Sequence, residues 1–261
     1  MATIYEKMTT IADRFRGYKQ ATDKFSLDEM PSAIDYAFSL GYDYYRVFTD
    51  HIAKDDFWDV FQCNGQRTNY AWAYAGNNFT DATLKPKYKM KVSNACQMFR
   101  GNINITDLSG IDMDFSQCTD FTQAFGACSA LAKVGNIDMT SATDTTGMFF
   151  TSRQVAEIGT LKVSETTAFE ATTFGWCQAL TTISFEGTIG QTISFVSSPL
   201  NKASIENIVT HLSNTAAGKT LTLKTGQVAT VFETSEGAAD GTSSAEWLSL
   251  IGAKSNWTIS V

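Results

Sequence analysis

The chain has 261 residues, of which 18% are charged and 43% hydrophobic, enough for one sizeable core or two small ones. Its 20 Lys and Arg against 27 Asp and Glu give a formal net charge of −7, and without a basic run this disfavours nucleic-acid binding. No stretch approaches the ~18 consecutive apolar residues of a membrane span, and the first residues lack a signal-peptide pattern. The 5 Cys are an odd number without a CxxC pair, which predicts reduced, buried thiols rather than disulfides or a zinc site.

Residues 1–40 are predicted to form an N-terminal helical module. A first helix is indicated by apolar residues at helical spacing, namely Ile4, Met8, Ile11, Ala12 and Phe15. The pattern Ser26-Leu27-Asp28-Glu29 is typical of a capping box and predicts the start of a second helix.

Residues 41–91 form an aromatic-rich segment that allows two interpretations. It holds 12 of the 32 aromatic residues of the chain. Such side chains would cover the first coil of a repeat domain, and Trp and Tyr are also common at glycan and protein contacts. We expect most of them to act as a cap, with a few exposed for recognition. Trp58 and Trp72 are the candidates for contact residues.

Residues 92–200 contain a repeat of about 25 residues. Phe99, Phe125, Phe149 and Phe174 are separated by 26, 24 and 25 positions. Three residues after each stands a small polar or thiol residue, and six after each an aliphatic one. These are Asn102, Cys128, Ser152 and Cys177, followed by Ile105, Leu131, Val155 and Leu180. A strand-like alternation then follows in the first three units as Ile111/Met113, Ile137/Met139 and Leu161/Val163.

This spacing predicts an α/β repeat solenoid. No unit could bury its apolar side alone, but stacked units would make ladders of like residues and one continuous core. We therefore expect the four Phe to form one buried ladder and the four aliphatic residues a second. On the outward side of three successive strands the alternation predicts Asp112, Asp138 and Lys162 at equivalent places.

Residues 201–261 are expected to form a C-terminal αβ cap. A helix carrying Ile205, Ile208, Val209 and Leu212, a strand at 220–223, a helix around Trp247 and a final strand at 257–261 fit such a cap. The Gly-, Ala- and Ser-rich stretch 235–244 is predicted to be a loop.

The repeat phrases Gln97-Met98-Phe99-Arg100-Gly101-Asn102 and Ala124-Phe125-Gly126-Ala127-Cys128 resemble the BspA-type leucine-rich repeat, over about residues 92–195. A third match is Phe174-Gly175-Trp176-Cys177-Gln178-Ala179-Leu180. The flanking segments, such as Phe57-Trp58-Asp59 and Gly237-Ala238-Ala239-Asp240-Gly241, resemble blocks found around such repeats in gut bacteriophage and prophage proteins. The resemblance implies a short leucine-rich-repeat solenoid and a virion protein.

No sequence feature indicates catalysis, a metal or a cofactor. There is no GxSxG, HExxH, Walker A or GxGxxG pattern, and His51 and His211 lack a nucleophile phrase nearby. Cys128 and Cys177 share a repeat position, but on the order of 10 Å would separate residues two coils apart, too far for a disulfide. Asp107, Asp112 and Asp114 do not have the spacing of an EF-hand loop.

We expect a non-enzymatic virion protein of the tail-fibre or receptor-binding class, as the resemblance implies. Its partners would be other virion proteins, through the N-terminal helices, and a host cell-surface protein or glycan. Self-association into a homo-oligomer stays open, and neither nucleic acid nor membrane insertion is expected. Two alternatives remain: a structural or decoration protein that contacts only virion proteins, and a glycan depolymerase. The candidate contact residues are Trp58, Trp72, Asp112, Asp138 and Lys162.

Overall fold

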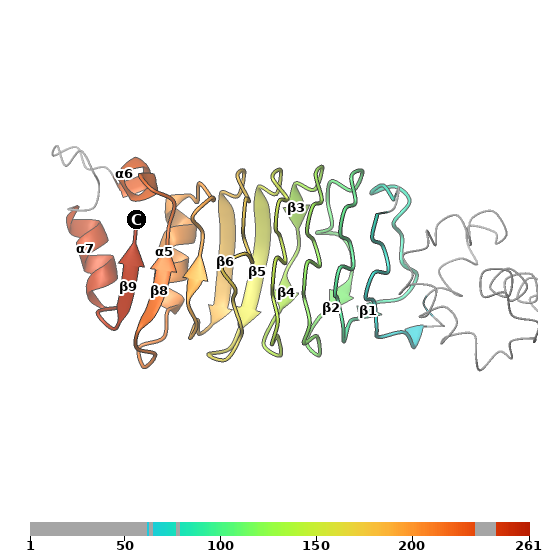
Figure 1. Cartoon of the computed structure of the whole chain (residues 1–261), viewed down its shortest axis with the longest axis horizontal. Coiled ribbons are helices and arrows are strands. Elements are labelled where there is room, and N and C mark those ends of the chain that lie inside the picture. Colours follow the sequence, from blue (N-terminus) through green and yellow to red (C-terminus); the bar gives the residue numbers. More distant parts are fainter. Residues whose placement is uncertain (1–61, 63–64, 77–78, 233–243) are drawn as a thin grey trace, which may run out of the picture.

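The computed structural model describes residues 62, 65–76, 79–232 and 244–261, and these form a parallel β-solenoid of about 6 turns. The coils are stacked in sequence order along the long axis of the molecule (Figure 1). The repeat solenoid predicted from the Phe spacing is therefore confirmed. The helices expected over 1–40 and the part of the aromatic segment over 41–61 lie outside the described residues.

Parallel strands run along one side of the stack. They are β1 (Met90–Lys91), β2 (Met113–Asp114), β3 (Lys133–Val134), β4 (Ile137–Asp138), β5 (Glu157–Val163) and β6 (Thr182–Gly187). β1 pairs with β2, whereas β3, β4 and β6 all pair with β5. Like residues are therefore in register from coil to coil, as when Ile137 pairs with Leu161 and Leu161 with Phe185. No strand ladder joins β2 to β4 within the described coils, although the two strands lie next to each other.

The opposite side of each coil is a tight, non-strand segment that we call the turn arm. The turn arms comprise residues 71–76, 96–101, 122–127, 146–151 and 171–176. Backbone N–H groups of one arm donate to carbonyls of the next, as from Phe99 to Ala124 and from Phe125 to Met148, both at 2.8 Å. The arms are thus linked like strands, which satisfies backbone groups that the stacking buries.

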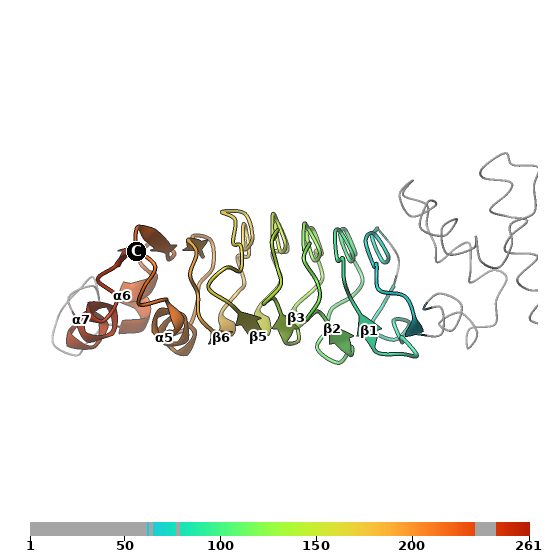
Figure 2. The same ribbon diagram turned by 90° about the horizontal axis from the view of Figure 1, so that it is seen from below.

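In the C-terminal part the strands lie on the side of the turn arms, and a helix lies on the side of the earlier strands. This part contains β7 (Ile193–Ser194), α5 (Lys202–His211), β8 (Lys219–Thr222), α6 (Gln227–Phe232), α7 (Ala245–Gly252) and β9 (Trp257–Ser260). β7, β8 and β9 form a parallel sheet on the side of the turn arms, whereas α5 lies on the side of β6 (Figure 2). The expected helix–strand–helix–strand order is present, and α6 is an additional helix that the sequence did not predict. Within the described ranges no helix is long and apolar enough to cross a bilayer.

Helix α5 takes the place of a strand beside β6 by using its side chains. Ser204 Oγ accepts a hydrogen bond from the Ile183 backbone N–H at 3.0 Å, and Asn207 Oδ1 accepts one from the Phe185 N–H at 2.6 Å. Asn201 caps the helix by accepting from the Ser204 N–H at 2.9 Å. The outer edge of β6 is therefore covered, and the strand ladder ends there.

A continuous stack of aromatic rings forms the centre of the solenoid. Phe99, Phe125, Phe149 and Phe174 are all buried, and consecutive ring centroids are 5.6, 5.1 and 5.8 Å apart with planes within 10–12°. This confirms the predicted Phe ladder. Tyr74 extends it toward the N-terminus at 4.9 Å from Phe99, and Phe195 extends it toward the C-terminus at 4.7 Å from Phe174. The second predicted set, Ile105, Leu131, Val155 and Leu180, is likewise buried.

The small residue three positions after each ladder Phe is a hydrogen-bond donor. Asn102 donates to the carbonyl of Tyr74, Cys128 to that of Phe99, Ser152 to that of Phe125 and Cys177 to that of Phe149. Each bond reaches back to the aromatic residue of the preceding coil. This explains why the position is held by thiol, hydroxyl or amide side chains, which can donate a hydrogen bond, and not by Ala, which would only fill the space.

Replacing Ser152 with Ala should strongly destabilise the chain. The buried Ser152 hydroxyl donates to the Phe125 carbonyl at 2.5 Å and accepts from the Cys128 N–H at 3.0 Å. Ala would leave both groups unpaired, at a cost of about 1–3 kcal/mol for each. Ser152→Cys is the control, because thiols hold this place in two other coils and keep a donor. Urea unfolding measures both variants, and equal losses for Ala and Cys would contradict the donor role.

Candidate functional site

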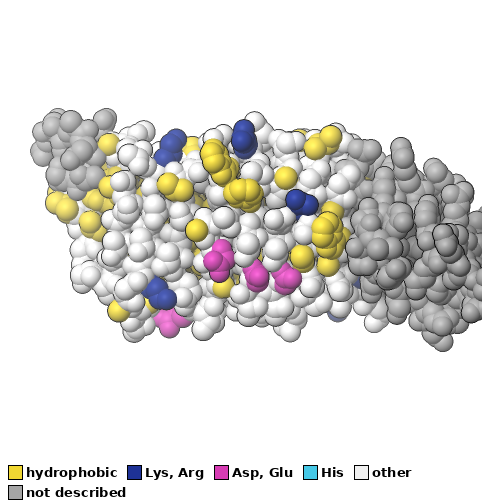
Figure 3. Space-filling view, in the orientation of Figure 1, with side chains coloured by type: hydrophobic (Ala, Val, Ile, Leu, Met, Phe, Trp, Pro, Cys, Tyr) yellow, Lys and Arg dark blue, Asp and Glu magenta, His cyan; other side chains and the backbone are white. Residues whose placement is uncertain are grey.

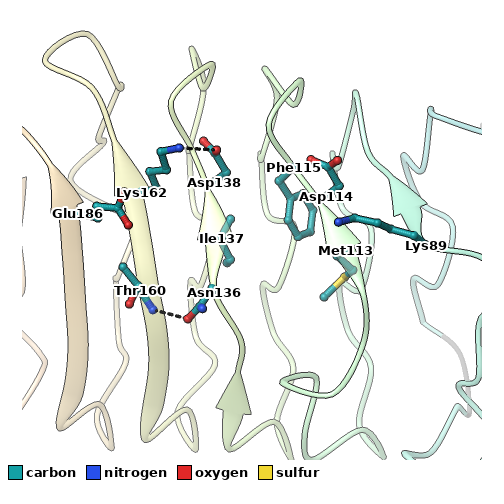
Figure 4. A pocket seen from close by; sticks show the side chains of 10 residues that line it. All are labelled: Lys89, Met113, Asp114, Phe115, Asn136, Ile137, Asp138, Thr160, Lys162 and Glu186. Carbon is teal, nitrogen blue, oxygen red and sulfur yellow. Dashed lines mark hydrogen bonds and ion pairs between the residues drawn. The ribbon is translucent and has the colours of Figure 1, made fainter.

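The outward side of the strands carries a row of charged side chains, one each from β2, β4, β5 and β6. Asp138 is in register with Lys162, and Lys162 with Glu186. Asp114 occupies the corresponding place at the end of β2 (Figure 4). We call Asp114, Asp138, Lys162 and Glu186 the strand-face row. Because strand side chains alternate, these residues face outward while their neighbours Ile137, Leu161 and Phe185 are buried.

A shallow hollow of about 300 Å³ lies on this face, where β2 and β4 meet without a shared strand ladder. Met113 and Phe115 bound it on one side and Asn136 and Ile137 on the other (Figure 4). Charged and hydroxyl side chains complete the lining, namely Lys89, Asp114, Asp138, Thr160, Lys162 and Glu186. The accessible lining is therefore mostly polar, which suits a group that forms hydrogen bonds, such as a sugar ring or a polar side chain of another protein.

Hydrogen bonds keep two carboxylates of the row ionised. Partial burial raises the pKa of Asp138, but hydrogen bonds from Thr140 and the charge of Lys162 outweigh it, so the net pKa lies below the usual value. The Thr140 hydroxyl donates to Asp138 at 2.6 Å, and Lys162 Nζ lies 3.5 Å from its carboxylate. Hydrogen bonds from the hydroxyl and backbone N–H of Ser116 likewise lower the pKa of Asp114.

The pKa values of these two carboxylates differ from the pattern of a glycosidase pair. A glycosidase needs one carboxylic acid whose raised pKa keeps it protonated near neutral pH, facing a second that is ionised. Asp114 and Asp138 are adjacent in the row, yet both pKa values are lowered. Asp114 and Asp138 therefore place ionised carboxylates, which accept hydrogen bonds, on the outer face of the strands.

The structure corrects the place of Asp112. Asp114, and not Asp112, matches Asp138, because each accepts hydrogen bonds from the residue two positions later, Ser116 or Thr140. Asp107 and Lys133 are partners in a β-bridge between neighbouring coils. Two more residues separate Asp107 from β2 than separate Lys133 from β4. Asp112 is exposed and lies 3.5 Å from Lys89 Nζ. The shared Asp-x-Ser/Thr pattern was the signal that could have revealed Asp114.

The other predicted positions are placed as follows. Asp138 and Lys162 are in register, which confirms their equivalence, while their role in binding stays a prediction. Trp72 lies in the first turn arm, away from the row, and is 36% exposed. Its neighbours Tyr70 and Tyr74 are buried, and their backbone N–H groups donate to carbonyls of the next coil, so this part of the aromatic segment is itself a coil of the solenoid. Trp58 lies outside the described residues. Glu186 joins the row without having been predicted.

Thiols, histidine and acidic residues form no reactive cluster within the described ranges. No group of three or more His, Cys, Asp or Glu side chains there could hold a metal ion. Cys118, Cys128 and Cys177 are unpaired and buried, and burial raises the pKa of each thiol to about 12. His211 ends α5 with its Nδ1 2.8 Å from the Asn207 carbonyl. Cys63 and His51 lie outside the described residues.

No family model, curated protein or solved structure matches this chain. The solenoid, its strand face and the resemblance of the repeat phrases are the features that indicate a function.

The lowered pKa of Asp138 predicts a pH-dependent contribution to stability. The pKa of Asp138 is lower in the folded chain than in the unfolded chain, so its ionised carboxylate stabilises the fold at pH values above the ordinary pKa of Asp. This stabilisation is lost as the pH falls through the folded-state pKa. Asp138→Asn should therefore destabilise at about pH 7 and have a smaller effect near pH 2.5. Thr140→Val should reduce the same pH-dependent part. Urea midpoints across this range provide the measurement, and a pH-independent loss in Asp138→Asn would show that the carboxylate charge is irrelevant.

Proposed function

We propose that this protein is a non-enzymatic binding protein of a phage or prophage virion, in the tail-fibre or receptor-binding class. It presents its strand face to a protein or glycan on the host-cell surface. The virion assignment rests on the resemblance of the repeats and flanks to gut phage proteins. The binding assignment is supported by the strand-face row, which displays ionised and hydrogen-bonding groups around a shallow hollow on a rigid sheet.

The solenoid gives this proposal its physical basis. Coil-to-coil register fixes the spacing of outward side chains at roughly 4.8 Å, so a ligand meets a regular array rather than a flexible loop. Outward residues can change without disturbing the aromatic stack, which suits a surface that must recognise varied hosts. In this proposal the helices predicted over residues 1–40 attach the chain to other virion proteins, directly or as a homo-oligomer.

A charge exchange in the row tests the binding role. Asp138 and Lys162 form an ion pair at 3.5 Å, so the double variant Asp138→Lys with Lys162→Asp keeps the pair but reverses the pattern that a ligand meets. We expect unchanged thermal unfolding and roughly tenfold weaker binding of the labelled chain to gut bacterial cells. The matched control exchanges Lys202 and Glu246, paired at 2.6 Å on the C-terminal helices, and should bind normally.

Two outcomes would overturn this proposal. Equal binding by the row exchange and the control would show that the strand face is not the contact surface. Release of reducing sugar ends from cell-envelope glycans by the purified chain, abolished by Asp→Asn variants that still fold, would establish a depolymerase instead.

A further inference from the structure

Trp176 places an exposed indole ring on a turn arm, in a backbone conformation that side chains rarely adopt. Its φ is 63° and 49% of the residue is exposed. The same place in earlier arms is held by Gly76, Gly101, Ala127 and Thr151, which also have positive φ. Hydrogen bonds between coils show that these places are equivalent. The backbone N–H of Thr151, for example, donates to the carbonyl of Gly175, the residue just before Trp176, and the other three places follow the same rule.

Glycine is the residue that this conformation favours, and a bulky aromatic is the least expected one. A Trp at such a place gains little from packing, since half of it is exposed. The same place in four earlier arms shares the positive φ, so the feature specific to Trp176 is its exposed indole ring. The sequence alone did not single out Trp176, because it lies inside the repeat phrase.

Arg153 completes the feature with a positive charge. Its guanidinium carbon lies 5.8 Å from the centroid of the Trp176 ring. None of the ion pairs between described residues uses Arg153. The side chain of Phe150 lies against the backbone of Gly175, and Val196 in the following coil is 54% exposed. Figure 3 shows hydrophobic, basic and acidic side chains together on the visible face of the solenoid.

We propose that Trp176 and Arg153 form a binding site for a carboxylate-bearing glycan, such as a sialic or uronic acid residue. The indole face stacks on the apolar C–H face of the sugar ring. The guanidinium donates two hydrogen bonds to the carboxylate, which a point charge could not do with the same geometry. The exposed area is a single ring beside one cation, which fits one or two sugar units better than an extended peptide.

This site is separate from the strand-face row and does not rest on its role. The row exchange leaves Trp176 and Arg153 unaltered, so each proposal can fail while the other holds.

The test uses the full chain with two matched pairs of probes. One pair is 3′-sialyllactose and lactose, and the other is a tetragalacturonate and its methyl ester. Calorimetry or tryptophan fluorescence should detect saturable binding of at least one acid, with its neutral counterpart bound about tenfold more weakly. Trp176→Gly and Arg153→Gln should each weaken binding about tenfold, and Arg153→Gln should also remove the preference for the acid. Arg100→Gln, an exposed Arg on another arm, is the control and should bind as the original chain does.

Trp176→Gly guards against a folding artefact, because glycine suits a φ of 63° and the variant should melt no lower than the original chain. Three results would overturn the inference: no saturable binding of either acid, equal binding of acid and neutral partner, or unchanged binding by Trp176→Gly. Capture of an acidic peptide with neither acid bound would assign the surface to protein contacts instead.

Discussion

The stack of aromatic rings through the centre is the interaction on which the remainder of this solenoid depends. From Tyr74 to Phe195 six rings follow one another at 4.7–5.8 Å, one ring from each coil. That distance is close to the spacing of hydrogen-bonded strands, so the rings and the strand ladders demand the same rise per coil. A coil of about 25 residues, too small to bury its own apolar side, becomes stable only between neighbours.

The other features that recur from coil to coil support this stack. The donor three residues after each Phe pairs with the carbonyl of the preceding aromatic residue, and the turn arms join their backbones from coil to coil. At the C-terminal end α5 replaces a strand and satisfies β6 with Ser204 and Asn207. Because the inner side and the backbone are so constrained, the outward residues are the ones that can change without disturbing the stack. The two proposed contact surfaces, the strand-face row and the Trp176–Arg153 pair, both consist of such outward residues.

The regular spacing of the Phe residues made the core predictable from the sequence. An insertion before β2 and the change of sides by the C-terminal strands were not predictable in the same way. Phe99 to Phe174 could be aligned because their period is nearly constant, and the buried ladder follows from it. Asp112 was assigned to the row because two extra residues before β2 leave an alternating pattern that can be read in either register. After β6 the strands change to the side of the turn arms. This change depends on contacts of α5 with residues distant in sequence, which no local pattern indicates. Trp176 was missed because its importance lies in a backbone angle and in its exposure, and neither is visible in sequence.

A double-mutant cycle on the stack tests the central claim most directly. Phe125→Leu and Phe149→Leu remove adjacent rings at 5.1 Å, so their effects on the free energy of unfolding should be coupled by about 0.5–1.5 kcal/mol. Phe99→Leu and Phe174→Leu remove rings that are separated by two others, and their effects should add to within about 0.5 kcal/mol. Coupling of the adjacent pair no larger than that of the separated pair would contradict a stack that fixes the spacing of the coils.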